Sequence, residues 1–192
     1  MQWTVTCLFV LLMAVAGPGC TRHRTFADRV ATPEWPEFTE RVKAYTEFSA
    51  RVAKGLPPLG DQATAQQIVT YKQSLEKAIR SGRAGARQGD IFTPAVRDKF
   101  ISVVRSETRG KTGTPAKRSI GEDNPNQAAR TVPLKVNAVY PDGPPLSIVP
   151  PTVLLRLPAL PETLDYRFVG KALVLRDVRA NIIVDFIPNA LL

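Results

Sequence analysis

The chain has 192 residues, of which 44% are hydrophobic, so it is long enough to bury the core of one ordinary domain or two small ones, and its composition excludes a disordered chain. The net charge is +9, and the segment from Lys77 to Arg118 carries +8 of it, with eleven basic residues against three acidic ones. One histidine and two cysteines exclude most metal and thiol chemistry.

The first twenty residues have the pattern of an export signal. Residues 5–16 form an uncharged apolar run, which is too short to span a bilayer of about 30 Å but has the length of a signal-peptide core. The chain becomes polar and basic directly after Cys20, although no Lys or Arg precedes the apolar run. Residues 1–20 are therefore predicted to be a signal peptide, followed by a tether at residues 21–31.

Two cleavage sites compete within this signal. Residues 14–16 (AVA) fit the small-x-small pattern that a general signal peptidase recognises, whereas residues 17–20 (GPGC) partly resemble a lipobox, with Gly17 in place of the usual leucine. Since Cys7 would be removed, Cys20 would be the lone thiol of an exported chain, and lipidation would protect it from oxidation. We expect an exported, periplasmic lipoprotein that is anchored to a membrane through Cys20, with simple secretion and an uncleaved anchor as the alternatives.

Three helices are predicted within residues 32–109, each with a threonine at its N-cap. Thr32 and Thr93 are followed by a first-turn proline, and Thr64 has the spacing of a capping box with Gln67. The first two helices should form an antiparallel hairpin, with the third packed across it. Their apolar stripes, at three- and four-residue spacing, are Phe38, Val42, Tyr45 and Val52, then Ile68, Tyr71, Leu75 and Ile79, then Val96, Phe100, Val103 and Val104.

The C-terminal third has β character. Residues 110–130 lack periodicity and predict a linker or a long loop, and residues 131–192 contain a proline-rich stretch, expected to be extended, before an antiparallel β-meander. In the last strand Val184 and Asp185 should face opposite sides, and its nearly continuous apolar character predicts a central strand or one covered by helices. The fold class is therefore predicted to be α+β. The predicted strands are 164–169, 173–178 and 182–187.

Two segments resemble bacterial exported proteins of unknown function. These segments are residues 88–94 (QGDIFTP) and the run from Pro150 to the C-terminus. This resemblance implies a location outside the cytoplasm but no activity. The hairpins of residues 166–187 are also similar to the small β domain of periplasmic proteins that include a nickel/cobalt-homeostasis family, and no metal ligand is carried over from them.

The residue counts argue against most catalysis. His23 is the only histidine, and it lies in the predicted tether, so neither a metal site nor a Ser/His/Asp or Cys/His arrangement is expected. Residues 81–89 (SGRAGARQG) lack the lysine spacing of a phosphate-binding loop. No cofactor, metal or catalytic residue is predicted, and the chain is not expected to be an enzyme.

Three aspartates of the meander leave one catalytic alternative. Asp165, Asp177 and Asp185 could approach one another across neighbouring strands and act as an acid/base pair. The structural alternative is that they bond to turn amides or to arginines. Asp185 lies in an apolar strand and would need a partner if buried, for which Arg176 or Arg167 is expected.

The basic segment predicts an anionic partner, such as lipid head groups, lipopolysaccharide or cell-wall polymers. Nucleic acid is not expected, because residues 81–89 lack base-stacking aromatics and the export signal separates the chain from it. A solvated face that only aids solubility is the alternative. The residues expected to contact the anionic partner are Lys77, Arg80, Arg83, Arg87, Arg105 and Arg109.

Three functions remain open from the sequence. The first is a non-enzymatic envelope protein that acts as a binding or scaffolding module. The second is a periplasmic accessory in metal or stress homeostasis, which the β-domain resemblance implies. The third is a carboxylate-dependent cell-wall hydrolase, which needs the three aspartates to meet in an open cleft.

Overall fold

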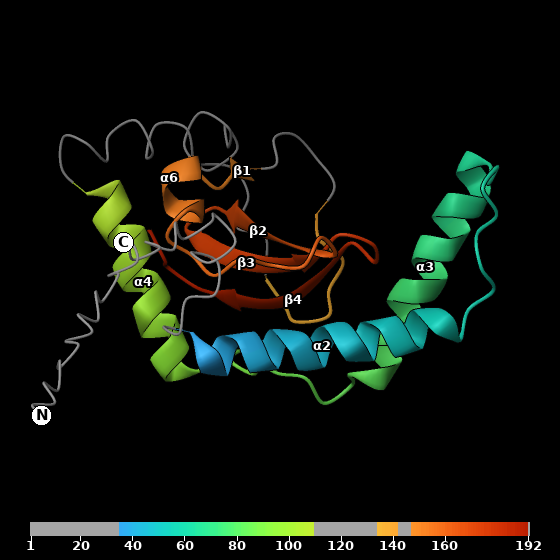
Figure 1. The fold of residues 1–192 in the computed structure, drawn as a ribbon, viewed down its shortest axis with the longest axis horizontal. Coiled ribbons are helices and arrows are strands. Elements are labelled where there is room, and N and C mark those ends of the chain that lie inside the picture. Colours follow the sequence, from blue (N-terminus) through green and yellow to red (C-terminus); the bar gives the residue numbers. More distant parts are fainter. Residues whose placement is uncertain (1–34, 110–133, 142–146, 192) are drawn as a thin grey trace, which may run out of the picture. The chain divides into compact units, whose positions relative to one another are not determined.

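The computed structural model describes residues 35–109, 134–141 and 147–191, and Figure 1 shows their arrangement. The predicted signal peptide with Cys20, the tether, the Thr32 cap and the linker lie outside the described residues. The elements in chain order are α2 (Pro36–Lys54), α3 (Ala65–Gly82), α4 (Pro94–Thr108), β1 (Ser147–Ile148), α6 (Pro151–Leu154), β2 (Leu164–Val169), β3 (Ala172–Asp177) and β4 (Ile182–Ile187). Helices thus precede an antiparallel sheet, and the predicted α+β class is confirmed.

Local capping explains where the helices begin. The predicted capping box of α3 is confirmed, because the Gln67 amide donates to Thr64 Oγ1 (3.3 Å) and the Thr64 amide donates to Gln67 Oε1 (2.7 Å). Thr93 caps α4 by accepting from the Val96 amide (3.5 Å). At the start of α2, Trp35 occupies the N-cap position and its side chain makes no capping bond.

The sheet has the strand order β1-β2-β3-β4, with every neighbouring pair antiparallel. Its last three strands form the predicted meander, and β2 and β4 have the predicted bounds, whereas β3 begins and ends one residue earlier. The two tight turns contain Gly170 (φ 57°) and Asn181 (φ 53°), residue types that tolerate the left-handed region. Short-range turn chemistry therefore fixes the order of these strands.

The proline-rich stretch was predicted to be extended, and this prediction is wrong at helix α6. Pro151 stands at the first helical position, where its missing N–H would have had no partner within the helix and its fixed φ suits the turn. The Pro150 carbonyl accepts from the amides of Val153 and Leu154, both at 3.0 Å. One helical turn forms here, although prolines surround it.

The predicted alternation of side chains between the two faces of the last strand is wrong in β4. Asp185 pairs with Leu175 and Ile183 pairs with Arg176, so Val184 is the extra residue of a β-bulge. Val184 consequently belongs to the same core cluster as Leu175, on the side to which Asp185 also points. Strand β4 is the last in the sheet order, not a central strand, and the backbone of residues 137–140 bonds to its outer edge. The expected cover by helices is present at Ile182, which packs with Leu75 and Ile79 of α3.

Aromatic side chains join the helices to the sheet. Trp35, Phe38, Phe92, Phe100 and Tyr166 are all buried, with neighbouring ring centroids 4.7 to 6.4 Å apart. They come from α2, α4, β2 and the segment between α3 and α4. Burying each such side chain contributes about 1.5–3 kcal/mol. This cluster, called the aromatic core below, holds α4 against the start of α2.

A second cluster holds α3 in place. Leu75 and Ile79 of α3 pack with Ile182 of β4, and Phe48 and Val52 of α2 lie against them. Contacts among α2, α3 and β4 therefore stabilise the predicted helical hairpin. Figure 1 shows α3 at the C-terminal end of α2. Of the predicted α3 stripe, Ile68 is exposed, because it lies near the tip of the hairpin.

Within the described ranges, no helix combines the length and the apolar character that crossing a bilayer requires.

Candidate functional site

Asp185 is fully buried and is bound by a loop rather than by an arginine. Its carboxylate accepts from the backbone amides of Gly89 (3.0 Å), Ile91 (2.9 Å) and Phe92 (2.8 Å). Gly89 has a φ of 92°, a conformation that glycine adopts readily and that turns its amide toward the carboxylate. The predicted pairing of Asp185 with Arg176 or Arg167 is wrong. Residues 88–94 and strand β4, which are far apart in the sequence, meet at this carboxylate.

Arg176 and Arg167 pair with Asp165 instead. Arg176 Nη2 lies 2.8 Å and Arg167 Nη2 lies 2.7 Å from Asp165 Oδ2, all on partly exposed side chains. The guanidinium of Arg176 also stacks over the ring of Tyr140, 5.0 Å from its centroid. These charges therefore form a structural network on the sheet face away from α2.

Asp177 is also fully buried and bonds to turn amides, as expected. It accepts from the Tyr45 hydroxyl (2.8 Å), the Ser49 hydroxyl (3.2 Å) and the amides of Arg179 and Ala180 (both 2.9 Å). Burial, and then the neighbouring Asp177 carboxylate, raise the pKa of Tyr45 well above its usual value, so this hydroxyl stays protonated and donates. Asp177 thereby fastens α2 to the end of β3.

The three aspartates do not meet in an open cleft. Asp177 and Asp185 are each 0% exposed, and each is satisfied by several donors, whereas Asp165 is held between two arginines. An acid/base pair needs a carboxyl group that a substrate can reach. The geometry required by the hydrolase hypothesis is therefore absent from these residues.

Arg83 makes several contacts within the fold. Its guanidinium donates to Asn137 Oδ1 (2.8 Å) and to the Val184 carbonyl (3.2 Å), and it lies over the ring of Tyr45, 4.9 Å from the centroid. Burial lowers the pKa of Arg83 from its usual value. Arg83 therefore has a structural role, and its contact with an anionic partner stays a prediction.

The remaining predicted basic residues fall into two groups. Lys77, Arg80 and Arg87 are exposed on or just after α3, where Arg80 pairs with Glu76 (2.8 Å). Arg105 and Arg109 lie together on α4, in a groove that none of the α3 residues lines.

Replacing Arg83 with glutamine is expected to lower the free energy of unfolding by about 1–3 kcal/mol, because Asn137 and the Val184 carbonyl each lose a charged donor. Urea denaturation measures the loss. Arg87→Gln is the matched control on an exposed side chain and should change stability by less than about 0.5 kcal/mol. Equal stability of the two variants would contradict the structural role of Arg83.

A groove on α4 is lined by three arginines and one aspartate. It has a volume of about 700 Å³, with one wall formed by α4 and the other by the turn after β4. Residues 97, 101, 105 and 109 follow one another at four-residue spacing, which keeps their side chains on one side of the helix. The lining residues are Arg97, Asp98, Ile101, Ser102, Arg105, Ser106, Arg109, Pro188 and Asn189.

Two of the three arginines in this groove are not neutralised. Arg97 pairs with Asp98 (3.0 Å), but among the described residues Arg105 and Arg109 have no carboxylate partner. The Nε atom of Arg105 is buried and has no hydrogen-bond partner among these residues. Guanidinium groups bind carboxylate and phosphate oxygens through parallel hydrogen bonds. The groove is thus suited to an anion.

Sequence reasoning found Arg105 and Arg109 but missed the rest of this groove. The four-residue spacing from Arg97 to Arg109 was the available signal for Arg97. Nothing local indicated Pro188 and Asn189, since the fold brings them to α4 from the far end of the chain.

Within the part of the chain that the structure describes, no group of three His, Cys, Asp or Glu side chains could hold a metal ion. The predicted location and the resemblance to exported proteins stay predictions. The chain matches no known family model, and comparisons with curated proteins and with solved structures found no similar protein.

Proposed function

We propose that this chain is an exported envelope protein, anchored to a membrane through a lipid on Cys20, whose folded domain is a non-enzymatic module that binds an anionic partner in the groove on α4. One observation carries the binding part of this proposal: Arg105 and Arg109 lie in the same groove of about 700 Å³, and no carboxylate of the described residues neutralises them. The export part rests on the sequence of residues 1–20.

The electrostatics of α4 favour an association that depends on salt. The groove contains three arginines and one aspartate, so it attracts anions when the ionic strength is low. Arg105 and Arg109 also belong to the last turn of α4 and its C-cap, where positive charge complements the helix dipole. Their presence therefore costs the fold little, although they have no acidic partners in the part of the chain that the structure describes.

The double variant Arg105→Gln/Arg109→Gln should bind vesicles of anionic lipid about thirtyfold more weakly than the unchanged chain, because each arginine near such a surface contributes about 1 kcal/mol. Cosedimentation at low and high salt measures this, with Cys20→Ala in both proteins so that no lipid anchor dominates. Binding of the unchanged chain should also weaken as the salt concentration rises.

Lys77→Gln/Arg87→Gln is the matched control, since it removes the same charge from exposed residues at and after α3. It should weaken binding much less. If both double variants bind equally weakly, only the net charge matters and the groove is not the site. If the unchanged chain binds neutral vesicles equally well, electrostatic binding is refuted.

Mass spectrometry of the mature N-terminus, combined with cell fractionation, tests the anchor. A diacylglyceryl-modified Cys20 in the membrane fraction is the expected result, with Cys20→Ala releasing the chain from the membrane. A mature chain that starts at Gly17 would refute anchoring while leaving export intact.

A further inference from the structure

We infer that the groove on α4 binds a phosphomonoester group, held by Arg105 as its main contact and by Arg109 as its second. The inference rests on the proposed function and names the chemical class of the ligand. A phosphomonoester is a phosphate with one organic substituent, as on a phosphorylated sugar or on phosphatidic acid.

The charge of the site favours this group over a single carboxylate or a phosphodiester. Two guanidinium groups without carboxylate partners among the described residues present a charge near +2, because the third arginine of the groove is neutralised by Asp98. A phosphomonoester carries about −1.5 to −2 at pH 7 and offers three oxygens as acceptors. A carboxylate or a phosphodiester carries −1, so it would leave one guanidinium without a counter-charge.

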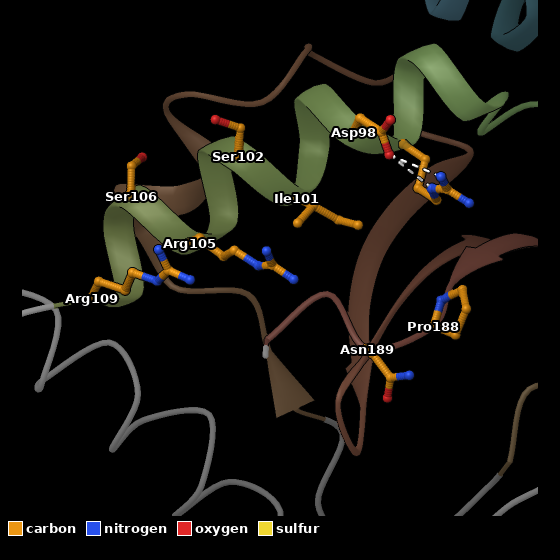
Figure 2. A pocket seen from close by; sticks show the side chains of 9 residues that line it. Asp98, Ile101, Ser102, Arg105, Ser106, Arg109, Pro188 and Asn189 are labelled. Carbon is orange, nitrogen blue, oxygen red and sulfur yellow. Dashed lines mark hydrogen bonds and ion pairs between the residues drawn. The ribbon is translucent and has the colours of Figure 1, made fainter.

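The direction of the Arg105 side chain places its guanidinium group away from the helix end. Side chains on a helix tilt toward its N-terminus, so Arg105 reaches back along α4. Figure 2 shows Arg105 extending below Ile101, into the space between α4 and the turn with Asn189. An anion bound there lies beside the helix, at a distance from the unfavourable carbonyl end of its dipole.

Arg105 is partly buried, which restricts its side chain. Its Nε atom is buried and has no hydrogen-bond partner among the described residues. Binding an anion therefore costs little side-chain entropy and gives the guanidinium group acceptors that the described part of the fold does not supply. This combination makes Arg105 the main contact.

The size of the groove leaves room for the substituent on the phosphate. A volume of about 700 Å³ is several times that of a phosphate group and falls in the range of small-molecule sites. Ile101 and Pro188 provide apolar surface beside the arginines. A sugar ring or a glycerol backbone satisfies these conditions equally, so the source of the phosphomonoester is decided by experiment.

Titration of the full chain carrying Cys20→Ala tests the inference, with binding followed by calorimetry or by chemical shifts of the α4 amides. The probes are glucose 1-phosphate and glucose, together with vesicles of phosphatidic acid and of phosphatidylglycerol matched in total charge. Glucose 1-phosphate should bind and glucose should not, and phosphatidic acid should bind more tightly than phosphatidylglycerol. Binding of phosphatidic acid alone would identify the lipid as the source.

Variants separate the role of Arg105 from that of net charge. Arg105→Gln should weaken phosphomonoester binding about tenfold or more, because it removes charge-assisted hydrogen bonds. Arg105→Lys should bind less tightly than the unchanged chain, since an ammonium cannot make the same parallel bonds. Arg87→Gln is the control outside the groove, with the same change of net charge on an exposed side chain, and should change binding less than about threefold. Circular dichroism checks that each variant is folded.

Failure of the inference and failure of the proposed function give different results. If the two vesicle types bind equally and glucose 1-phosphate does not bind, the phosphomonoester assignment is overturned, while salt-sensitive binding through Arg105 and Arg109 still supports the proposed function. If no anionic probe binds, both are overturned. If Arg87→Gln weakens binding as much as Arg105→Gln, the assignment of Arg105 as the main contact is wrong.

Discussion

Replacement of Asp185 by alanine is expected to lower the free energy of unfolding by about 3–5 kcal/mol, a large share of the 5–15 kcal/mol that is typical of a domain. The carboxylate accepts from the amides of Gly89, Ile91 and Phe92, and all three lose their acceptor in the variant. An unsatisfied buried amide costs about 1–3 kcal/mol. The loop before α4 should therefore detach from β4 or keep these amides unpaired, and both outcomes destabilise the fold.

Urea denaturation of Asp185→Ala measures this effect. Asp185→Asn keeps one acceptor oxygen of similar shape and should lose roughly half as much stability. Asp165→Ala is the control on a partly exposed aspartate of the same sheet, with an expected loss of about 1 kcal/mol or less. A loss below about 1 kcal/mol for Asp185→Ala would show that the loop amides find other acceptors.

The partner of Asp185 shows what sequence reasoning left out. An acid within an apolar strand was correctly expected to need a partner, but only charged side chains were considered. Every residue except proline has a backbone N–H, so no residue type identifies these donors as partners. The available signal was Gly89, because a glycine followed by residues of buried character indicates a loop whose backbone approaches another group closely.

The meander was predictable because its determinants are local. The turns at Gly170 and Asn181 and the apolar strands between them set the order and nearly all the bounds of β2, β3 and β4. The bulge at Val184 was not predictable in the same way. The position of a bulge depends on how β4 pairs with β3 and on what the two bulge residues contact. Here Val184 contacts the core, and Asp185 contacts the loop before α4.

The groove on α4 was also predictable only in part. The basic residues of one helix can be counted from the sequence, and two of the six predicted residues do line the groove. Arg83 has the same charge, but its guanidinium donates a hydrogen bond to Asn137 within the fold. Asn137 lies more than fifty positions away in the sequence and has a positive φ. Sequence spacing identifies a helix face, but only the tertiary fold decides which charges on it remain available to a partner.

Replacing Phe100 with alanine should lower the free energy of unfolding by about 3–5 kcal/mol, because its fully buried ring lies at the centre of the aromatic core. The ring centroids of Trp35 (4.7 Å), Phe38 (5.0 Å) and Phe92 (5.0 Å) surround it, so its removal leaves a cavity that three elements border. Urea denaturation followed by circular dichroism gives the loss of stability.

Trp35 provides a second and more local measurement of the same variant. Since the other tryptophan, Trp3, lies in the predicted signal peptide, Trp35 fluorescence would report on the aromatic core alone. Its emission in Phe100→Ala should shift to longer wavelength before unfolding. Leu59→Ala, on a side chain that is 39% exposed, should change stability by less than about 0.5 kcal/mol. If fluorescence and circular dichroism give separate transitions in the unchanged chain, the helices and the sheet do not unfold as one cooperative unit, and the aromatic core does not join them as proposed.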